Sequence, residues 1–282
     1  MPKVGFIGAG NVACSMGRYF SEGGIPISGY HSPSKESVDY AATFTGSTAY
    51  FSKKELVEKS DIVFIATPDD AILSVWESIK EQNIDGKIIA MFSGSLSSDL
   101  FSGIEKTGAS GASVHPMFAF SDKNSDYQKL NTVRLTLEGD DKAVQSIKQI
   151  FESLGNVVTV IDKSSKKAYH AAAAIASNLM IGLYDLSLNV LCECGFEREG
   201  AIELVKPLVK NNVTAMLDTG CVNALSGPVE RADIEVVKSH LNTLSGDDRE
   251  IYRLLSKRLV EISQEKYPDR DYEKFRELLE NK

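Results

Sequence analysis

The sequence predicts an α/β fold, in which a doubly wound parallel sheet comes first and an all-helical C-terminal domain follows. Three observations predict it. Short apolar runs alternate with amphipathic helical patterns as far as residue 161, which is typical of a parallel sheet covered by helices. A glycine-rich stretch, residues 8–13, separates the first apolar run from the first helical pattern. Beyond residue 161 the apolar spacing is helical throughout.

The individual elements follow from the spacing of apolar residues. Strands are expected at residues 4–7, 25–30, 61–66, 87–92, 112–115, 132–137 and 157–161, with helices between them at 12–22, 53–59, 71–81 and 141–154. A long Ala- and Leu-rich helix, capped by Ser164 or Ser165, is expected from 166 to 194 and ends before Gly195. Further helices are expected at 198–210, 213–218, 234–243, 248–265 and 272–279. We therefore expect a domain boundary near residue 163, between residues 1–163 and 164–282.

The composition argues against several classes of protein. The 282 residues are 43% hydrophobic and 25% charged, as in an ordinary folded protein, and the net charge of −8 argues against nucleic acid or an anionic membrane as a partner. The longest apolar runs are strand-sized, and the first residues lack the pattern of a signal peptide. The four cysteines form no CxxC pair. We expect reduced thiols, no metal site and a cytoplasmic protein.

The stretch Gly8-Ala9-Gly10-Asn11-Val12-Ala13 has the Gly-x-Gly-x-x-Ala pattern of a dinucleotide-binding turn. Gly8 allows a sharp turn off the strand, Gly10 leaves space for a pyrophosphate, and Ala13 lets the helix pack closely on the strand. The N–H groups at the start of the helix then face the phosphates. This strand–turn–helix context predicts that residues 8 to 13 bind a dinucleotide, a Rossmann-type arrangement.

The end of the second strand indicates which dinucleotide. NAD-binding proteins place an acid about 20 residues after the fingerprint, but residues 28–35 contain none. The polar side chains there are those of His31, Ser32, Ser34 and Lys35, which suit the 2′-phosphate of NADP better than a ribose hydroxyl. The same serines, with Pro33 between them, would also serve simply to start a helix.

Three later strands end in polar residues at the same edge of the predicted sheet. Thr67 and Pro68 follow one strand, Ser93 and Gly94 follow the next, and His115 ends the one after. Because parallel sheets bind ligands at the carboxyl ends of their strands, we expect the first four to contact the cofactor and His115 to contact the substrate. Ordinary strand–helix turns would give similar sequences.

The start of the long helix carries candidate catalytic residues. At about 3.6 residues per turn, Lys167, His170, Ala174 and Asn178 fall on one stripe, and the alanines between them leave room for a ligand. Such a Lys would donate the proton that completes a reduction. In the second half, Ser226 offers a hydroxyl and Arg231 can bind a carboxylate in bidentate geometry. A solvated helix start and a surface arginine are the alternatives.

Together these motifs resemble the Rossmann-like NADP oxidoreductases with a DUF2520 C-terminal domain. The resemblance rests on residues 8–13, 67–70, 93–95 and 115–117, on Lys167-x-x-His170 with Ser177-Asn178, and on residues 225–233. That group is similar to the 6-phosphogluconate dehydrogenase-like set, which includes ketopantoate reductase and pyrroline-5-carboxylate reductase. Relatives place a proton-donating Lys at the start of the long helix and an Asn four residues on. Here position 171 is Ala, so the resemblance leaves Asn178 or His170 to substitute.

The sequence therefore predicts an NADPH-dependent reductase of a small 2-oxo acid, with ketopantoate as the substrate that the resemblance implies. The alternatives are an imine reductase of the pyrroline-carboxylate type and a non-catalytic NADP-binding regulator. Within the catalytic reading, Lys167 or His170 is the proton donor, and Asn178 and Ser226 orient the substrate. The apolar long helix further predicts a homodimer through the helical domain.

Overall fold

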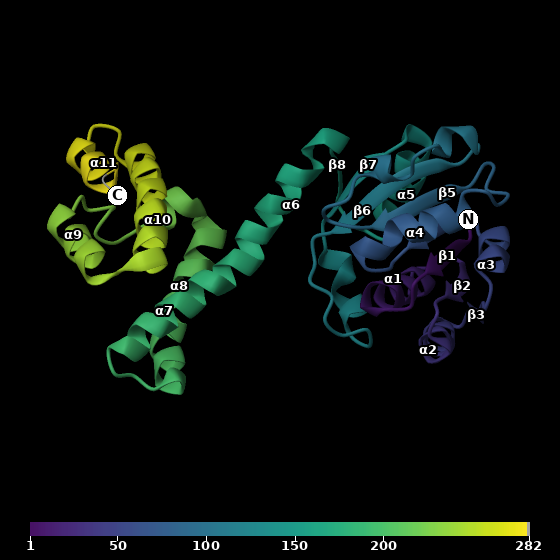
Figure 1. Ribbon diagram of the computed structural model, residues 1–282, viewed down its shortest axis with the longest axis horizontal. Coiled ribbons are helices and arrows are strands. Elements are labelled where there is room, and N and C mark those ends of the chain that lie inside the picture. Colours follow the sequence, from purple (N-terminus) through teal and green to yellow (C-terminus); the bar gives the residue numbers. More distant parts are fainter. Residues whose placement is uncertain (281–282) are drawn as a thin grey trace. The chain divides into compact units, whose positions relative to one another are not determined.

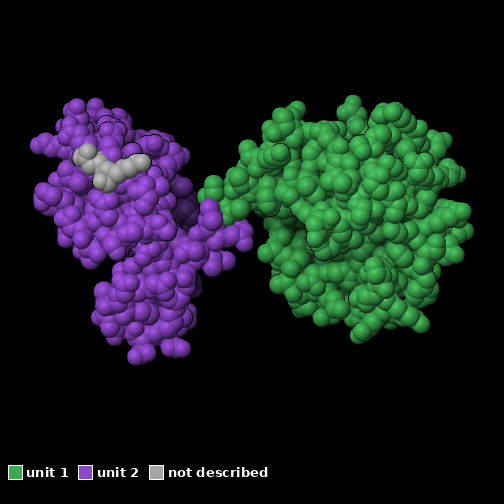
Figure 2. All heavy atoms as spheres, viewed as in Figure 1, with its two compact units in different colours: residues 1–176 green, residues 177–282 purple. Residues whose placement is uncertain are grey.

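The computed structural model describes residues 1–280, and the chain forms two compact units. One unit is Met1–Ala176 and the other is Ser177–Lys282, coloured separately in Figure 2. The boundary falls inside the predicted long helix, whereas the sequence placed the division ahead of that helix, at 163. Each unit is described by itself below.

The first unit is built on a mostly parallel sheet of eight strands in the order β3-β2-β1-β4-β5-β6-β7-β8 (Figure 1). The strands are β1 (Val4–Ile7), β2 (Ile27–His31), β3 (Thr48–Ala49), β4 (Ile62–Ile65), β5 (Ile88–Phe92), β6 (Ser110–Pro116), β7 (Leu135–Gly139) and β8 (Val158–Val160). The α/β prediction is confirmed. One pair departs from the parallel expectation, because β7 runs antiparallel to β6.

Helices pack on both faces of this sheet. They are α1 (Asn11–Glu22), α2 (Lys35–Thr45), α3 (Lys53–Lys59), α4 (Asp69–Ile79) and α5 (Asp141–Ser153). Alternate strand residues point to opposite faces, so Phe6 and Phe64 pack with α1, α2 and α5, whereas Val63 and Ile65 pack with α3 and α4. Short 3₁₀ turns complete the unit: η1 (Ser98–Leu100), η2 (Ile104–Lys106), η3 (Asp126–Thr132) and η4 (Lys163–Ser165).

Two elements of the first unit were not predicted, α2 and β3. Ser34 caps α2 by accepting a hydrogen bond from the Ser37 amide, and Gly46, at a φ of 65°, ends it. The helix buries mostly small side chains, which give a weak apolar pattern. The helix-start interpretation of the serines at the end of β2 is therefore correct for Ser34.

The predicted long helix is interrupted. It consists of α6 (Lys166–Ala174), a π-helical turn labelled η5 (Ile175–Leu179), and α7 (Met180–Glu193). The chain then forms α8 (Arg198–Ala224), α9 (Ile234–Thr243), α10 (Gly246–Lys266) and α11 (Glu273–Glu280). Helix α8 replaces two predicted helices and bends at Gly220, whose φ is 80°. The core of the second unit is formed by residues of α9, α10 and α11, among them Val237, Leu241 and Val260.

Much apolar surface of α7 and α8 is exposed. The stretch Lys163–Glu193 is long and apolar enough to cross a membrane, by length and composition only. An 18-residue window within it has a mean hydropathy of 1.4, and 6% of that window is buried within the chain. On α8, Leu208 is 61% and Leu217 is 75% exposed.

The four cysteines are free thiols.

Candidate active site

The turn between β1 and α1 has the geometry that a pyrophosphate requires. Gly8 adopts a φ of +119°, and a Cβ there would lie 2.3 Å from the Ala66 carbonyl oxygen. At Gly10 a Cβ would meet no atom within 4 Å, so the space above this residue is open. Gly10 precedes α1, which has no side-chain cap and no acid in its first turn, and Ala13 is fully buried against the sheet. The first N–H groups of α1 therefore remain available to an anion.

Thr67 lies next to this turn and supplies an unpaired hydroxyl. A Cβ at Gly8 would come within 3.3 Å of the Thr67 amide nitrogen, so the two residues are adjacent. The Thr67 Oγ1 atom is buried and has no hydrogen-bond partner within residues 1–280, and Pro68 follows it at the start of α4. An orphaned hydroxyl beside an open glycine turn fits a bound dinucleotide.

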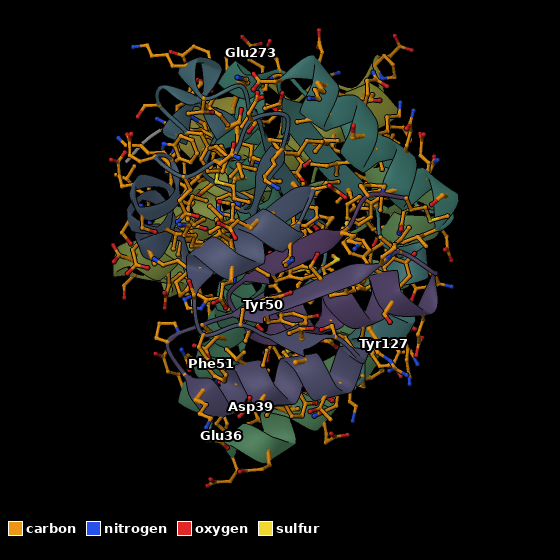
Figure 3. All side chains as sticks on the ribbon, turned by 90° about the vertical axis from the view of Figure 1, so that its right-hand side faces the viewer. Glu36, Asp39, Tyr50, Phe51, Tyr127 and Glu273 are labelled. Atoms are coloured by element: carbon orange, nitrogen blue, oxygen red, sulfur yellow. The ribbon has the colours of Figure 1, made fainter. Side chains whose placement is uncertain are left out.

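The end of β2 is polar but only partly free. The His31 ring hydrogen-bonds through Nδ1 to the Tyr50 carbonyl oxygen at 3.1 Å, and Ser34 is occupied in capping α2. Lys35 is exposed, with its ammonium 5.8 Å from the centre of the Phe51 ring. Figure 3 shows Tyr50 and Phe51 together at this end of the unit. Ser32 and Lys35 therefore remain the better candidates for a 2′-phosphate than Ser34.

A turn formed by residues 93–96 follows β5 and is stabilised by hydrogen bonds of its two serine hydroxyls. Asp69 Oδ2, at the start of α4, accepts hydrogen bonds from Ser93 Oγ at 3.0 Å and Ser95 Oγ at 2.6 Å. Ser93 Oγ in turn accepts from the amide nitrogens of Ser95 and Leu96 at 3.2 and 2.9 Å. These bonds fix the backbone at Gly94.

Two imidazole rings lie directly against Gly94. A Cβ there would lie 2.5 Å from His170 Nδ1 and 2.9 Å from His115 Nε2, so no side chain fits without moving them. The two rings are 6.0 Å apart between centroids. Tyr169, next to His170 on α6, places its hydroxyl 2.9 Å from His115 Nδ1. The structure thus brings together three predicted residues, Gly94, His115 and His170.

Lys166 is the cation of this cluster. It is 1% exposed, and its Nζ donates to Ser113 Oγ at 2.9 Å. The Ser113 hydroxyl donates in turn to the Leu96 carbonyl oxygen at 2.9 Å, which links Lys166 to the 93–96 turn. The other buried charge nearby, Glu138 at the end of β7, accepts from the amide and the hydroxyl of Ser98.

Burial sets the protonation of these groups. It lowers the pKa of Lys166 to about 8, against the opposing charges of Glu138 and Asp69. Burial, together with Lys166 and His170, lowers the pKa of His115 to about 4, so this ring is neutral near pH 7. The pKa of Tyr169 is raised, mainly by burial. The site therefore holds a Lys that can lose its proton near neutral pH, a property shared by many catalytic acids and bases.

Lys166 was not among the predicted site residues, because the spacing of polar residues favoured its neighbour Lys167. Lys167 is exposed, because α6 presents Lys166, Tyr169 and His170 to the strand ends. Positions i, i+3 and i+4 share a helix face, so the pair Tyr169 and His170 was the signal that could have selected Lys166.

The remaining predicted residues lie elsewhere. Asn11 donates to the Ser121 carbonyl oxygen at 3.3 Å, and Val12 packs against the core. Asn178, Ser226 and Arg231 belong to the second unit, where all three are exposed. Ser226 lines a small apolar pocket of about 260 Å³ together with Leu225, Leu259 and residues of α8. Arg231 stands in a turn in which Ala232 has a φ of 60°.

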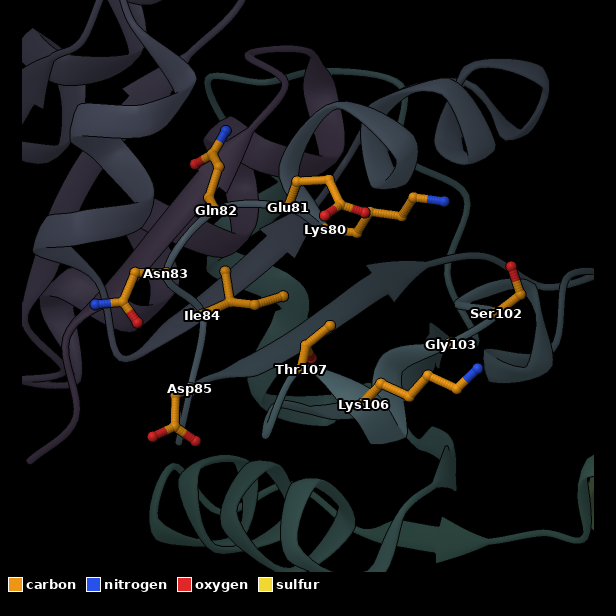
Figure 4. A pocket seen from close by; sticks show the side chains of 10 residues that line it. All are labelled: Lys80, Glu81, Gln82, Asn83, Ile84, Asp85, Ser102, Gly103, Lys106 and Thr107. Atoms are coloured by element: carbon orange, nitrogen blue, oxygen red, sulfur yellow. The ribbon is translucent and has the colours of Figure 1, made fainter.

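A larger hollow of about 520 Å³ lies at the opposite edge of the sheet (Figure 4). Its lining comes from the segments that precede β5 and β6, and includes Lys80, Gln82, Asp85 and Lys106. These are the amino ends of parallel strands, whereas the glycine turn and the Lys166 cluster lie at carboxyl ends. Residues 1–280 contain no group of three or more His, Cys, Asp or Glu side chains placed to hold a metal ion.

Two family models match the chain. Residues 3–90 match the family described as "NADP oxidoreductase coenzyme F420-dependent", and residues 133–259 match the domain of unknown function DUF2520. The chain thus contains an NADP-oxidoreductase region followed by a DUF2520 domain, as the resemblance in the sequence implied. No curated protein matches the chain significantly.

Solved structures share the whole architecture. Protein TM1727 from Thermotoga maritima is 29% identical, with a TM-score of 0.76 over 93% of this chain and 98% of that one. An imine reductase from Myxococcus stipitatus in complex with NADP+ is 16% identical, with a TM-score of 0.62 over 94% and 93%. A pyrroline-5-carboxylate reductase from Coxiella burnetii is 17% identical, with a TM-score of 0.60 over 94% and 98%. The fold of this chain is therefore the one that these three structures share.

Proposed function

We propose that this chain, which joins an NADP-oxidoreductase region to a DUF2520 domain, reduces a small 2-oxo acid with NADPH, ketopantoate being the first candidate. The observation that carries the proposal is the buried Lys166, held by Ser113 at the same edge of the sheet as the open glycine turn. A dinucleotide bound at that turn supplies a hydride when it is reduced. The residues around Lys166 can supply the proton.

In this proposal the side chains of the first unit act on the carbonyl oxygen. Hydride addition leaves negative charge on that oxygen, and the Lys166 ammonium stabilises the charge and then donates a proton from Nζ. Neutral His115 and the Tyr169 hydroxyl, hydrogen-bonded to each other, orient the oxygen. Lys166 thereby takes the role first predicted for Lys167, and His170 is the next candidate. Asn178 and Ser226 as orienting groups, and Arg231 as a carboxylate anchor, remain predictions.

The test is a substrate screen. Purified protein is mixed with NADPH and a panel of 2-oxo acids, and oxidation of NADPH is followed at 340 nm. Ketopantoate should be reduced with the highest kcat/KM. If another 2-oxo acid is preferred, the substrate changes but the reaction class is supported, whereas turnover of none of them removes the proposal.

Imine reduction is the second candidate, favoured by the likeness to pyrroline-5-carboxylate reductase and to imine reductases. A protonated imine already carries the proton that a ketone oxygen must acquire during reduction, so it needs less help from an acid. Cyclic imines in the same screen distinguish the two classes. If the protein is a regulator that binds NADPH without catalysis, no compound in either panel should cause oxidation of NADPH.

We expect tighter binding of NADPH than of NADH. The end of β2 holds Ser32 and Lys35 and no acid before Glu36, which Figure 3 shows on α2. Fluorescence titration should give a lower Kd for NADPH, and the double variant Ser32→Ala/Lys35→Ala should raise that Kd while leaving NADH binding unchanged. Equal affinities for the two cofactors in the wild type would refute the NADP assignment.

The rate of carbonyl reduction should depend on pH through Lys166. Its pKa of about 8 lies below the usual value near 10.5, so the protonated donor is lost as pH rises through about 8. The kcat/KM for reduction should therefore fall about tenfold per pH unit above that point, whereas an unperturbed lysine would remain protonated until about pH 10. A profile of kcat/KM from pH 6 to 10 checks this. A flat profile across this range would contradict the assignment.

We expect the protein to form a homodimer in the cytoplasm through its helical unit. Ile181 on α7 and Leu208 and Leu217 on α8 are all more than half exposed, more apolar surface than one helical unit normally leaves open. A second copy of the chain would cover it. Light scattering at micromolar protein should give twice the chain mass, and Leu208→Glu should shift the protein toward monomer. A monomer mass for the wild type would exclude this arrangement.

A further inference from the structure

The loop of residues 118–125, which links β6 to η3, contacts both helices that begin near the dinucleotide turn. From α1, the Asn11 side-chain amide donates to the Ser121 carbonyl oxygen at 3.3 Å. From α2, the Tyr40 hydroxyl donates to Asn124 Oδ1. The loop is therefore attached to the rim of the phosphate site.

Two aspartates fix the shape of this loop. Asp126 is 1% exposed, and its Oδ2 accepts from the amide nitrogens of Ser121 and Asp122 at 2.7 and 2.8 Å. Asp122 in turn accepts from the Ser125 hydroxyl at 2.7 Å. Both carboxylates are thus engaged with the loop itself, and they hold Lys123 between them in a fixed backbone.

The Lys123 ammonium lies over an aromatic ring of α2. Its Nζ is 3.9 Å from the centre of the Tyr40 ring, and it forms no ion pair with any residue that the structure describes. Its charge is also felt in α1: burial raises the pKa of the Cys14 thiol to about 11, and Lys123 opposes that rise. Cys14 lies at the start of α1, where its Sγ donates to the Ala9 carbonyl oxygen.

Two sources of positive charge in this region have no acidic partner among residues 1–280. The N-terminus of α1 already carries partial positive charge, and no acidic residue in its first turn offsets it. The chain has a net charge of −8, yet no acidic side chain within residues 1–280 forms an ion pair with Lys123. An anion bound at the turn would offset both positive charges.

We propose that Lys123 binds a phosphate group of the dinucleotide, so that the 118–125 loop completes the site begun by residues 8–13. The proposal rests on NADPH binding but not on the reaction that follows. It assigns a cofactor role to a loop far along the chain from the glycine turn. The phosphate group is either one of the pyrophosphate or the 2′-phosphate. Comparing NADPH with NADH distinguishes the two, because NADH lacks the 2′-phosphate.

The experiment compares the wild type, Lys123→Met and the control Lys106→Met, with NADPH and NADH titrated against each by fluorescence. Methionine keeps the length and the contact with Tyr40 but removes the charge. Lys106 is an exposed lysine at the opposite edge of the sheet. We expect Lys123→Met to raise Kd about tenfold or more and Lys106→Met to leave it unchanged. A rise for NADPH alone identifies the 2′-phosphate, and equal rises for both cofactors identify the pyrophosphate.

Unchanged Kd values for both cofactors in Lys123→Met would overturn the proposal. Thermal unfolding of each variant shows whether the fold is retained, and Lys123→Arg, which restores the charge, should recover most of the affinity. If Lys123→Arg does not recover the affinity, a phosphate contact by residue 123 is contradicted. A wild type that binds NADPH but reduces no carbonyl or imine would remove the proposed function and leave this inference standing.

Discussion

Replacing Lys166 with Met should lower kcat for carbonyl reduction by about 10²- to 10⁴-fold, the usual loss when a positioned acid is removed. This corresponds to roughly 3–5 kcal/mol of barrier, at about 1.4 kcal/mol per tenfold change. The Kd for NADPH should be nearly unchanged, because the proposed contact of Lys166 is with the carbonyl oxygen. Methionine fills most of the space of the buried side chain and leaves no unpaired charge. Steady-state kinetics and a cofactor titration on the same preparations measure both quantities.

The adjacent residue provides a matched control for this variant. Lys167 is exposed, so Lys167→Met removes the same charge one position along α6 without touching the Ser113 contact. It should keep kcat within about twofold of the wild type. If Lys167→Met abolishes turnover and Lys166→Met does not, the original sequence prediction was right and the assignment from the geometry is wrong. If neither does, His170→Ala becomes the next variant to measure.

The sequence alone does not determine which of these two lysines faces the strand ends. A Lys-Lys pair at a helix start predicts that one of them is useful, but the rotation of the helix decides which. In the structure, the rotation of α6 buries Lys166 against Ser113 and leaves Lys167 exposed. The predicted stripe also assumed one regular helix, whereas Asn178 lies within the π-helical turn at 175–179, which changes the register there.

Other elements were predictable to differing degrees for physical reasons. Helices α3 and α9 were predicted with the bounds that the structure gives them, because polar residues flank a clear apolar pattern. The direction of β7 was not predicted, because the spacing of apolar residues carries no information about strand direction. The link from β6 to β7 is a loop and a 3₁₀ turn instead of a crossover helix, and the strand returns antiparallel. The contact of residues 118–125 with α1 depends on this return and could not be derived from local pattern.

The second large effect is expected for a substitution in the glycine turn, residues 8–13. Gly10→Ala should weaken NADPH binding at least tenfold while changing the free energy of unfolding by no more than about 1 kcal/mol. The residue has a φ of −85°, which alanine adopts freely, and its added Cβ would touch no protein atom within 4 Å. That same space is where a pyrophosphate would approach the backbone. The variant therefore tests the ligand site without disturbing the fold.

Gly8→Ala is the contrasting variant, because its effect should fall on the fold as well. Alanine is strained at a φ of +119°, and its Cβ would lie 2.3 Å from the Ala66 carbonyl oxygen. The two penalties together should cost about 3 kcal/mol or more of unfolding free energy. Urea unfolding and NADPH titration of both variants separate the roles: Gly8 shapes the turn, and Gly10 leaves room for the ligand. If Gly10→Ala binds NADPH with wild-type affinity, the open space above Gly10 is not where the pyrophosphate binds, and the dinucleotide assignment at this turn fails.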